Sequence, residues 1–347
     1  MIGHLSDKAV FGCVVFFIQG ELGDLVFFEV HKNSPPSFSF FGFLYNTTFY
    51  TRIQVFLGGF RGVYFLETVY RAGLFVVQFK RIRRMQSMRA IPVLEQEQGI
   101  RAFFSTKKGA SPESPFYNKK TLQELGLEDP VLVWLQQVHG SRIAQVTKEQ
   151  AAASRNSAAA PVDYWGTIPG SPREGVPAVT FPETDGVMTD MPGVLLTTVH
   201  ADCIPVWFYD PVHRAVAVSH AGWKGTLAGI AAKTVKAMEE AYGTRPEDLK
   251  TAIGPGISLC CFQVGMEVYE QFAAAWPYAE EYRAEDPEEG KCRLDLKGLN
   301  KRQLADLGVK SIEVSPHCTF CEPELFCSYR REGGMKMRQG AGILLLK

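Results

Sequence analysis

Two histidines and one cysteine, each at the end of an apolar run, are the residues best suited to chemistry. His139 follows "LVWLQQV", Cys203 follows "VLLTTVHAD" and His220 follows "AVAVS". Two imidazoles and a thiolate give a zinc ion three ligands and leave a fourth position for water, as catalytic zinc sites do. Such an ion lowers the pKa of water and polarises substrate oxygens. The residues alone leave a second interpretation open, in which Cys203 is a small buried side chain and the histidines belong to the core.

Asp202, directly before Cys203, is the first candidate for proton transfer. A carboxylate there could orient a ligand imidazole or act as a general base. It could equally be an ordinary turn residue at a strand end. His200 and His213 lie in the same stretch of sequence.

The stretch "HAGWKGT" predicts an anion-binding turn. Its two glycines let backbone approach a ligand, Lys224 supplies charge, and a helix beginning at Thr226 would present free N–H groups. The spacing differs from that of a P-loop, so it does not indicate a nucleoside triphosphate. Arg330 and Arg331 could bind phosphate or carboxylate through their forked donors. The alternatives are a simple strand–helix turn and a solvated arginine pair.

The stretch "PHCTFCEPELFC" offers half of a zinc-ribbon signature in His317, Cys318 and Cys321. A structural zinc needs a second pair of ligands, and no second Cys pair stands at a usual spacing. A second zinc is therefore the less favoured interpretation. The cysteines that could complete the set are Cys260, Cys261 and Cys327.

Composition narrows the class of protein. The 347 residues carry a formal net charge of zero, which gives no sign of a basic surface for nucleic acid. The eight cysteines are unevenly spaced and two are adjacent, unlike the disulfide framework of a small secreted protein. We therefore expect reduced thiols and a cytoplasmic location.

Residues 1–87 differ from the rest, with fifteen of the twenty-four phenylalanines lying before residue 85. No run in them reaches the roughly 18 apolar residues of a spanning helix. We predict a leader outside the folded protein, with the working start at Met85 or Met88. The alternative is a membrane-associated or partner-binding extension.

From residue 88 onward, strand and helix patterns alternate, which predicts a single α/β or α+β domain over 88–347 without a membrane segment. One of the helices should begin at the N-cap Thr226 and end at Gly243. Residues 151–178 read as a surface loop. The expected strands are 100–106, 130–140, 193–199, 204–210, 215–220, 250–258, 311–316 and 340–347, and the expected helices 121–128, 226–242, 264–276 and 294–308.

Six motifs, in this order, resemble one known family. They are "QQVHGSRI", "TDGVMTD", "LLTTVHADCIPVWFYDP", "AVAVSHAGWKGT", "AIGPGISLCCFQVG" and "CTFCEPELFCSYRR". The chain resembles, over about residues 100–347, the bacterial laccase-domain family, formerly called polyphenol oxidase and now described as zinc-dependent purine nucleoside phosphorylase with adenosine deaminase activity. The resemblance implies that His139, Cys203 and His220 bind zinc, and that His200 and His213 are neighbours of the ligands rather than ligands. It also implies a layered α/β/β/α sandwich with mixed sheets, similar to the catalytic domain of cytotoxic necrotizing factor.

The resemblance further implies a purine nucleoside and phosphate as small-molecule partners. Deamination of adenosine would attack C6, as other zinc deaminases do. Among the departures from the family pattern, Lys107 and Lys224 stand where arginine is commoner, and a lysine lacks the bidentate fork. The implied catalytic residues are Asp202, Cys203 and Lys224, and those implied to bind phosphate or substrate are Lys107, Gln137, Trp223 and Arg330.

Three other functions stay open at this point. Copper-dependent phenol oxidation is disfavoured because the chain has no His-x-His pair, although copper could occupy a His₂Cys site. A cysteine hydrolase would use Cys203 as nucleophile and His220 as base, for instance to edit peptidoglycan precursors by amide hydrolysis. A non-catalytic binding module with a structural zinc is the third.

Overall fold

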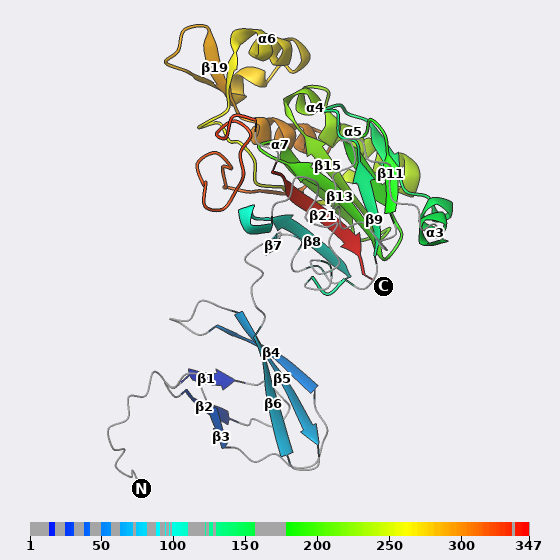
Figure 1. Cartoon of the computed structure of the whole chain (residues 1–347), viewed down its shortest axis with the longest axis vertical. Coiled ribbons are helices and arrows are strands. Elements are labelled where there is room, and N and C mark those ends of the chain that lie inside the picture. Colours follow the sequence, from blue (N-terminus) through cyan, green and yellow to red (C-terminus); the bar gives the residue numbers. More distant parts are fainter. Residues whose placement is uncertain are drawn as a thin grey trace. The chain divides into compact units, whose positions relative to one another are not determined.

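The computed structural model forms two compact units, Met1–Ile82 and Arg83–Lys347. Its described residues are the strands within 14–90, then 94, 97, 99–109, 122, 125–127, 130–156, 178–334 and 337–346. The first unit contains two three-stranded antiparallel sheets (Figure 1). That residues 1–87 are a leader outside the working protein stays a prediction. The strands of this unit are β1 (Val14–Phe17), β2 (Leu25–Val30), β3 (Phe38–Phe41), β4 (Tyr50–Phe56), β5 (Val63–Arg71) and β6 (Leu74–Arg81).

The second unit is built on two six-stranded sheets that each mix parallel and antiparallel pairs. This confirms the mixed α/β class. The first sheet has the order β10 (Ile143–Gln145), β12 (Gly186–Thr189), β15 (Ala215–Ala221), β14 (Ile204–Asp210), β16 (Lys250–Ile253), β20 (Ser311–Val314). The second has the order β11 (Ala178–Phe181), β9 (Val131–Leu135), β13 (Val194–His200), β21 (Gln339–Leu345), β8 (Ile100–Ser105), β7 (Met88–Ala90).

Strand β14 shows why the first sheet lies in the middle of the unit. All seven of its residues are buried, and successive side chains point to opposite faces as in any strand. Val206 and Phe208 pack against the helices, whereas Trp207 and Tyr209 pack toward the second sheet. The sheet is therefore covered on both faces.

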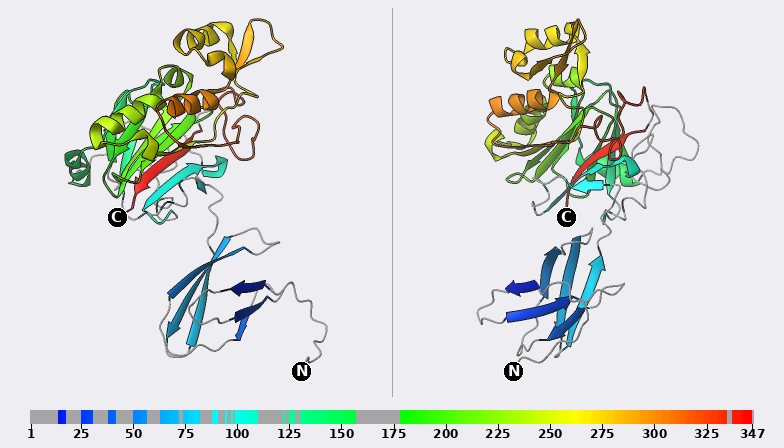
Figure 2. Two further views of the ribbon diagram at one scale, coloured as in Figure 1. Left: turned by 180° about the vertical axis from the view of Figure 1, so that it is seen from behind. Right: turned by 90° about the vertical axis from the view of Figure 1, so that its left-hand side faces the viewer.

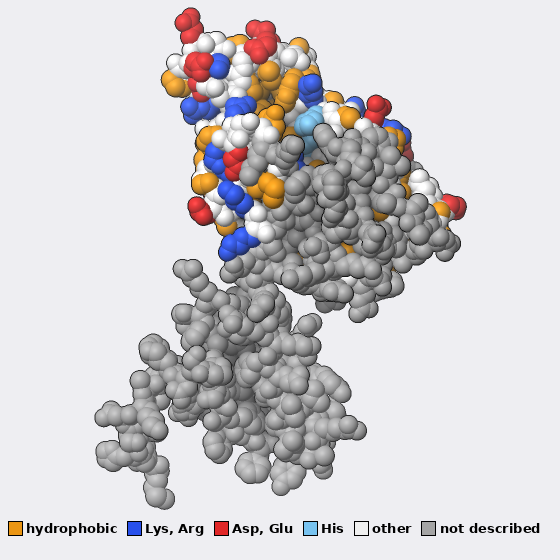
Figure 3. Space-filling view, in the orientation of Figure 1, with side chains coloured by type: hydrophobic (Ala, Val, Ile, Leu, Met, Phe, Trp, Pro, Cys, Tyr) orange, Lys and Arg blue, Asp and Glu red, His pale blue; other side chains and the backbone are white. Residues whose placement is uncertain are grey.

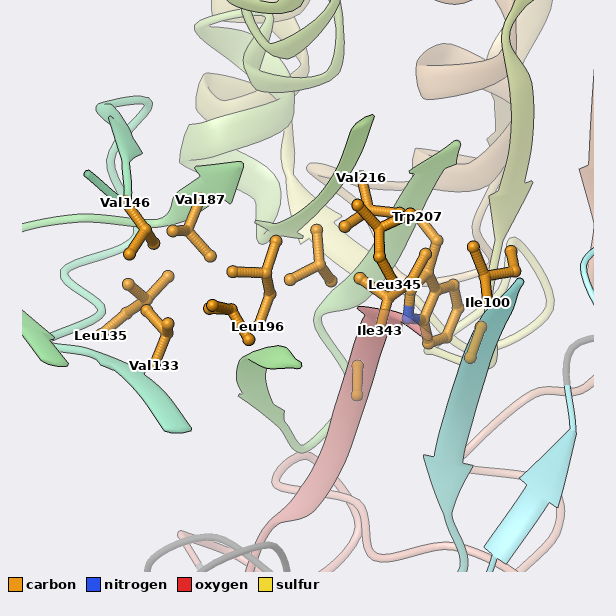
Figure 4. Packing of buried hydrophobic residues seen from close by; sticks show 14 of the residues in the cluster. Ile100, Val133, Leu135, Val146, Val187, Leu196, Trp207, Val216, Ile343 and Leu345 are labelled. Carbon is orange, nitrogen blue, oxygen red and sulfur yellow. The ribbon is translucent and has the colours of Figure 1, made fainter. Parts of the chain in front are cut away.

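Between the two sheets lies a core of aliphatic side chains and Trp207 (Figure 4). Val133 and Leu196 come from the second sheet and Val187 from the first. The indole N–H of Trp207 donates to the carbonyl of Gly342 over 3.2 Å, which joins the sheets through a polar contact inside the apolar layer.

Helices cover the outer face of the first sheet, with α4, α5 and α7 side by side and α6 in a smaller lobe beside the β17–β19–β18 sheet (Figures 1 and 2). No helix in the described part of the chain is both long and apolar enough to cross a membrane. These elements are α3 (Lys148–Asn156), α4 (Trp223–Leu227), α5 (Ile230–Tyr242), α6 (Met266–Ala275), α7 (Leu296–Asp306), β17 (Gln263–Gly265), β18 (Arg283–Glu285) and β19 (Lys291–Leu294), with 3-10 turns at Lys107–Gly109, Pro246–Asp248 and Ala279–Tyr282.

The helix predicted over 226–242 is two helices, so the N-cap assigned to Thr226 was wrong. Gly229, at a φ of 74°, separates α4 from α5 and is the N-cap of α5. Thr226 lies buried inside α4, where its hydroxyl accepts a hydrogen bond from Asn300 over 2.9 Å. The predicted end at Gly243 is confirmed, since this residue caps α5 at a φ of 72°.

The loop predicted over 151–178 was wrong in its first part, because α3 extends to Asn156. A capping box begins this helix: Gln150 N–H donates to the Thr147 hydroxyl, and Thr147 N–H donates to the Gln150 side chain. An alanine run then favours the helical state. Residues 157–177, and half of the helix expected over 121–128, lie outside the described residues.

Candidate metal centre and adjoining pocket

Three sequence-distant side chains converge at one end of the sandwich. His139 follows β9, Cys203 lies in the connection from β13 to β14, and His220 is near the end of β15. One ligand atom from each of them lies within 4.8 Å of the other two. The imidazole rings of His139 and His220 stand 4.9 Å apart in an edge-to-face arrangement. The structure therefore brings together the three residues that the strand-end pattern singled out.

A buried carboxylate that the sequence analysis did not assign holds two of these ligands. Asp185 accepts hydrogen bonds from the backbone N–H of Val138 (3.2 Å), His139 (3.0 Å) and Gly140 (2.7 Å). Its Oδ1 lies 2.8 Å from Nδ1 of His220. A carboxylate on Nδ1 leaves Nε2 of the imidazole facing the cluster, as is usual for metal-ligating histidines. Asp185 thus has the orienting role considered for Asp202.

The donor set and the space beside it suit a metal ion. A Cβ at Gly222 would lie 3.1 Å from Sγ of Cys203 and 3.1 Å from Cδ2 of His139, so only glycine leaves this side of the cluster open. Two imidazoles and a thiolate fit zinc, and they also fit copper. The residues therefore match the ion that the resemblance implies, while the geometry does not distinguish the two metals.

The cluster favours a thiolate at Cys203. Burial raises the pKa of this thiol, but His220 and His139 outweigh burial and lower it to about 6. Burial lowers the pKa of His220, whereas the Cys203 sulfur and the Asp185 carboxylate raise it above its ordinary value. A thiolate beside imidazole is ready both to bind a cation and to act as a nucleophile.

The neighbouring histidines make other contacts. The ring of His200 is buried, with Nε2 2.8 Å from the Thr198 hydroxyl and Nδ1 3.1 Å from the carbonyl of Cys203. Nδ1 of His213 lies 2.8 Å from Oδ2 of Asp210. Both rings have their own polar partners, in keeping with the interpretation that neither is a ligand.

Asp202 reaches away from the histidines toward the loop before β21. Its carboxylate accepts hydrogen bonds from the hydroxyls of Thr319 (2.6 Å) and Ser328 (2.9 Å) and from the N–H of Arg330 (2.8 Å). Three donors occupy both of its oxygens. The contacts identify Asp202 as the residue that anchors this loop beside Cys203.

A pocket of about 350 Å³ lies near the cluster through Trp223 and Gly222, although His139, Cys203 and His220 are not among its lining residues. Trp223, which follows Gly222, forms one wall, and Arg330 lies over the ring of Phe262 at 5.6 Å. Lys224 is exposed, with its ammonium 5.6 Å from the Trp223 ring. Lysine and arginine side chains also gather on the surface over the loop before β21 (Figure 3). The pocket lining is Trp223, Phe262, Gln263, Val264, Gly265, Val268, Lys291 and Arg330.

Gln137 and Lys107, which were also predicted to bind phosphate or substrate, lie outside the pocket lining. Both ends of the Gln137 amide bind the backbone of Val199, at 2.8 and 2.7 Å. The ammonium of Lys107 lies 3.2 Å from the carbonyl of Pro323 and 3.5 Å from the carboxylate of Glu332. Their contacts connect backbone segments around the cluster.

The sequence matches the family model described as multi-copper polyphenol oxidoreductase laccase over residues 104–346. The chain belongs to this laccase-domain family. Purine nucleoside phosphorylase YlmD of Geobacillus stearothermophilus is 34% identical to it, over 71% of this chain and 90% of that protein. Purine nucleoside phosphorylase YfiH of Escherichia coli is 30% identical over 65% and 78%.

A solved laccase-domain structure has the same fold. The crystal structure of Bacillus licheniformis hypothetical protein YfiH superimposes with a TM-score of 0.61 at 32% identity, covering 76% of this chain and 97% of that one. The family match contains every residue of the metal centre and the pocket, since all of them lie between 104 and 346. The shared laccase domain is thus the part of the chain that carries the site.

Proposed function

We propose that this protein is a zinc-dependent purine nucleoside phosphorylase with adenosine deaminase activity. It converts adenosine, inosine and S-methyl-5′-thioadenosine to the free base and ribose 1-phosphate or methylthioribose 1-phosphate. The observation that carries the proposal is the convergence of His139, Cys203 and His220 near a pocket lined by Trp223 and by Arg330, whose guanidinium donates to the carbonyl of Gln263. The names of its relatives support the reaction class.

The pocket supplies what a purine nucleoside and phosphate require. Trp223 offers an aromatic face on which a purine can stack. Arg330 in the pocket lining and Lys224, whose ammonium lies 5.6 Å from the Trp223 ring, are exposed cations that would offset the charge of a phosphate dianion. Phosphate oxygen then bonds to C1′ while the bond from C1′ to the purine nitrogen breaks, and the leaving purine takes up one proton.

His139, Cys203 and His220 would hold the zinc ion, with Asp185 fixing the His220 ring. When bound, zinc supplies Lewis acidity that polarises a substrate oxygen or lowers the pKa of water. Asp202 positions the backbone of Arg330 through a 2.8 Å hydrogen bond, so we assign it a positioning role in place of proton transfer. Gln137 and Lys107 support the site through their backbone contacts.

The proposed layer order, fold likeness and cellular location rest on the same family membership. The four-layer α/β/β/α order is supported by helices on the first sheet and by Leu122 and Leu127 packed on the outer face of the second. We also propose that this fold is similar to that of the catalytic domain of cytotoxic necrotizing factor. A cytoplasmic location is supported by the seven described cysteines, which are all free.

Incubation of the purified chain with adenosine, inosine and methylthioadenosine, with and without phosphate, tests the proposal. Free base should form only with phosphate, and inosine should form from adenosine without it. His139→Ala should abolish both, whereas His213→Ala, at a histidine outside the cluster that pairs with Asp210, should keep them. No turnover of any nucleoside by metal-loaded protein would contradict the proposal.

The low pKa of Cys203 favours one second candidate, a cysteine hydrolase. There the thiolate would attack an amide carbonyl and His220 would protonate the leaving amine. Amide hydrolysis that survives a chelator and is lost on alkylation of Cys203 would support this candidate. Loss of activity with the chelator and its return with zinc would support the nucleoside enzyme.

A further inference from the structure

A second group of metal-binding side chains lies outside the centre described above. The sulfurs of Cys260, Cys261, Cys318 and Cys321 all lie within 4.8 Å of one another. The Cys260 and Cys321 sulfurs are 3.6 Å apart, and those of Cys261 and Cys321 are 3.2 Å apart. Four sulfurs placed tetrahedrally at the Zn–S distance of about 2.3 Å would be about 3.8 Å apart. The cluster already has close to that size.

We propose that Cys260, Cys261, Cys318 and Cys321 form a closed, four-thiolate structural zinc site, separate from the His139–Cys203–His220 centre. Four sulfur ligands leave no coordination position for a substrate, so this ion would stabilise the fold and take no part in the reaction. The inference does not depend on which reaction the first centre performs.

The backbone around Cys318 has the hydrogen bonds that metal thiolates receive. Burial raises the pKa of Cys318, but N–H groups of Ser258, Cys321 and Phe320 donate to its sulfur and lower the pKa to about 7. Cys318 and Cys321 form a Cys-x-x-Cys turn, and Gly256 pairs with Cys318 in an isolated parallel bridge. The two cysteine-bearing loops are thus held side by side by main-chain contacts.

A buried lysine balances the charge that four thiolates would bring. Lys297 is only 4% exposed, and its ammonium donates to the Ser258 hydroxyl (3.0 Å) and to the carbonyls of Ser315 (3.1 Å) and His317 (2.6 Å). These partners are neutral, so the lysine has no carboxylate among its hydrogen-bond partners. Burial lowers the pKa of Lys297 to about 8, and the charges of Cys318, Asp295 and Cys260 act against this lowering. A zinc ion with four thiolates carries two negative charges, and Lys297 would offset one.

The site would fasten together the two loops that form the pocket. Cys261 precedes Phe262, and Cys321 lies in the loop that carries Arg330. Arg331 supports the second loop, since its guanidinium donates to the carbonyls of Thr319 (2.6 Å) and Phe320 (2.8 Å). From the sequence, a second zinc was the less favoured interpretation because no second cysteine pair stands at a usual spacing from Cys318 and Cys321. The adjacent Cys260 and Cys261 supply that pair here, while His317 stands apart and contacts Glu322 at 2.9 Å.

Metal content of the full chain, purified without oxygen and loaded with zinc, tests the site. We expect two zinc ions per chain in the wild type and one in the double variant Cys318→Ser/Cys321→Ser. His139→Ala/His220→Ala should also retain one, and this ion should be the thiolate-bound one. Cys327→Ser is the matched control, because this buried cysteine lies in the same loop but outside the group, and it should retain two.

Cobalt gives a second measurement that needs no cysteine substitution. Co²⁺ added to His139→Ala/His220→Ala should give intense thiolate-to-cobalt charge-transfer absorption that one equivalent of zinc removes. One zinc ion per chain that disappears in His139→Ala/His220→Ala, together with no cobalt–thiolate absorption, would overturn the proposal. So would a Cys261–Cys321 disulfide, seen by peptide mass in freshly purified protein, because its formation removes two of the four ligands.

Discussion

Replacing Asp185 by asparagine tests how the metal ligands are held in place. The carboxylate accepts four hydrogen bonds, with His139 N–H and His220 Nδ1 on Oδ1, and Val138 and Gly140 N–H on Oδ2. An asparagine has one oxygen and one NH₂ group. In either orientation, the NH₂ group faces two donors, so two hydrogen bonds are lost.

The expected loss of stability follows from the two hydrogen bonds that asparagine cannot accept. Hydrogen bonds to a charged group contribute about 1.5–3 kcal/mol each, so two lost bonds should lower the free energy of unfolding by about 3–6 kcal/mol. One orientation of the amide releases the His220 ring, and the other releases the turn that carries His139. Loss of such a support typically weakens metal binding 10- to 100-fold, or by about 1.4–2.8 kcal/mol.

The assay pairs zinc affinity, by competition with a chelator, with thermal unfolding of the metal-free protein. Asp210→Asn is the matched control, because Asp210 is also buried and accepts the N–H of Val212 and His213 and contacts Nδ1 of His213. Both variants should unfold at lower temperature, and only Asp185→Asn should bind zinc more weakly. Equal zinc affinity in Asp185→Asn and the wild type would refute the orienting role.

Three further predictions concern the same site. Gly222→Ala should weaken zinc binding at least about fivefold in the competition assay, because overpacking against the Cys203 sulfur at 3.1 Å costs about 1 kcal/mol or more. Arg330→Ala should raise the KM for phosphate about 10- to 100-fold in steady-state kinetics, since a charged hydrogen bond is lost. In metal-free protein, alkylation of Cys203 should reach half its maximal rate near pH 6, and His220→Ala should move that midpoint upward. Because the folded pKa is depressed, the thiolate's contribution to stability is present above about pH 8.5 and is lost as pH falls through about 6.

The sequence was informative where the chemistry lies at the ends of strands. His139, Cys203 and His220 could be recognised because each follows an apolar run, and strand ends gather at the edges of sheets. Asp185 carried no such signal, although it stands in the quoted "TDGVMTD" motif. Its role depends on four donors that lie 35 to 47 residues away in the chain, and only the tertiary fold shows them.

Local backbone geometry accounts for the other differences. The run from 226 to 242 is rich in helix formers, but Gly229 adopts a left-handed φ that ends one helix and begins the next. The four-cysteine group combines residues up to 61 positions apart, so neither half resembles a complete zinc motif. The cysteine group depends on how distant segments of the chain meet in the fold, which residue spacing does not encode.

One residue of the metal centre and one that adjoins it have strained backbones, and carboxylates hold both in place. His139 has a φ of 61° and Asp202 a φ of 82°, and such conformations cost non-glycine residues about 1–3 kcal/mol each. Asp185 binds the N–H groups on both sides of His139, whereas the Asp202 side chain binds Thr319, Ser328 and Arg330. These hydrogen bonds offset the strain. The positions of His139 and of the backbone before Cys203 are therefore set by the polar scaffold.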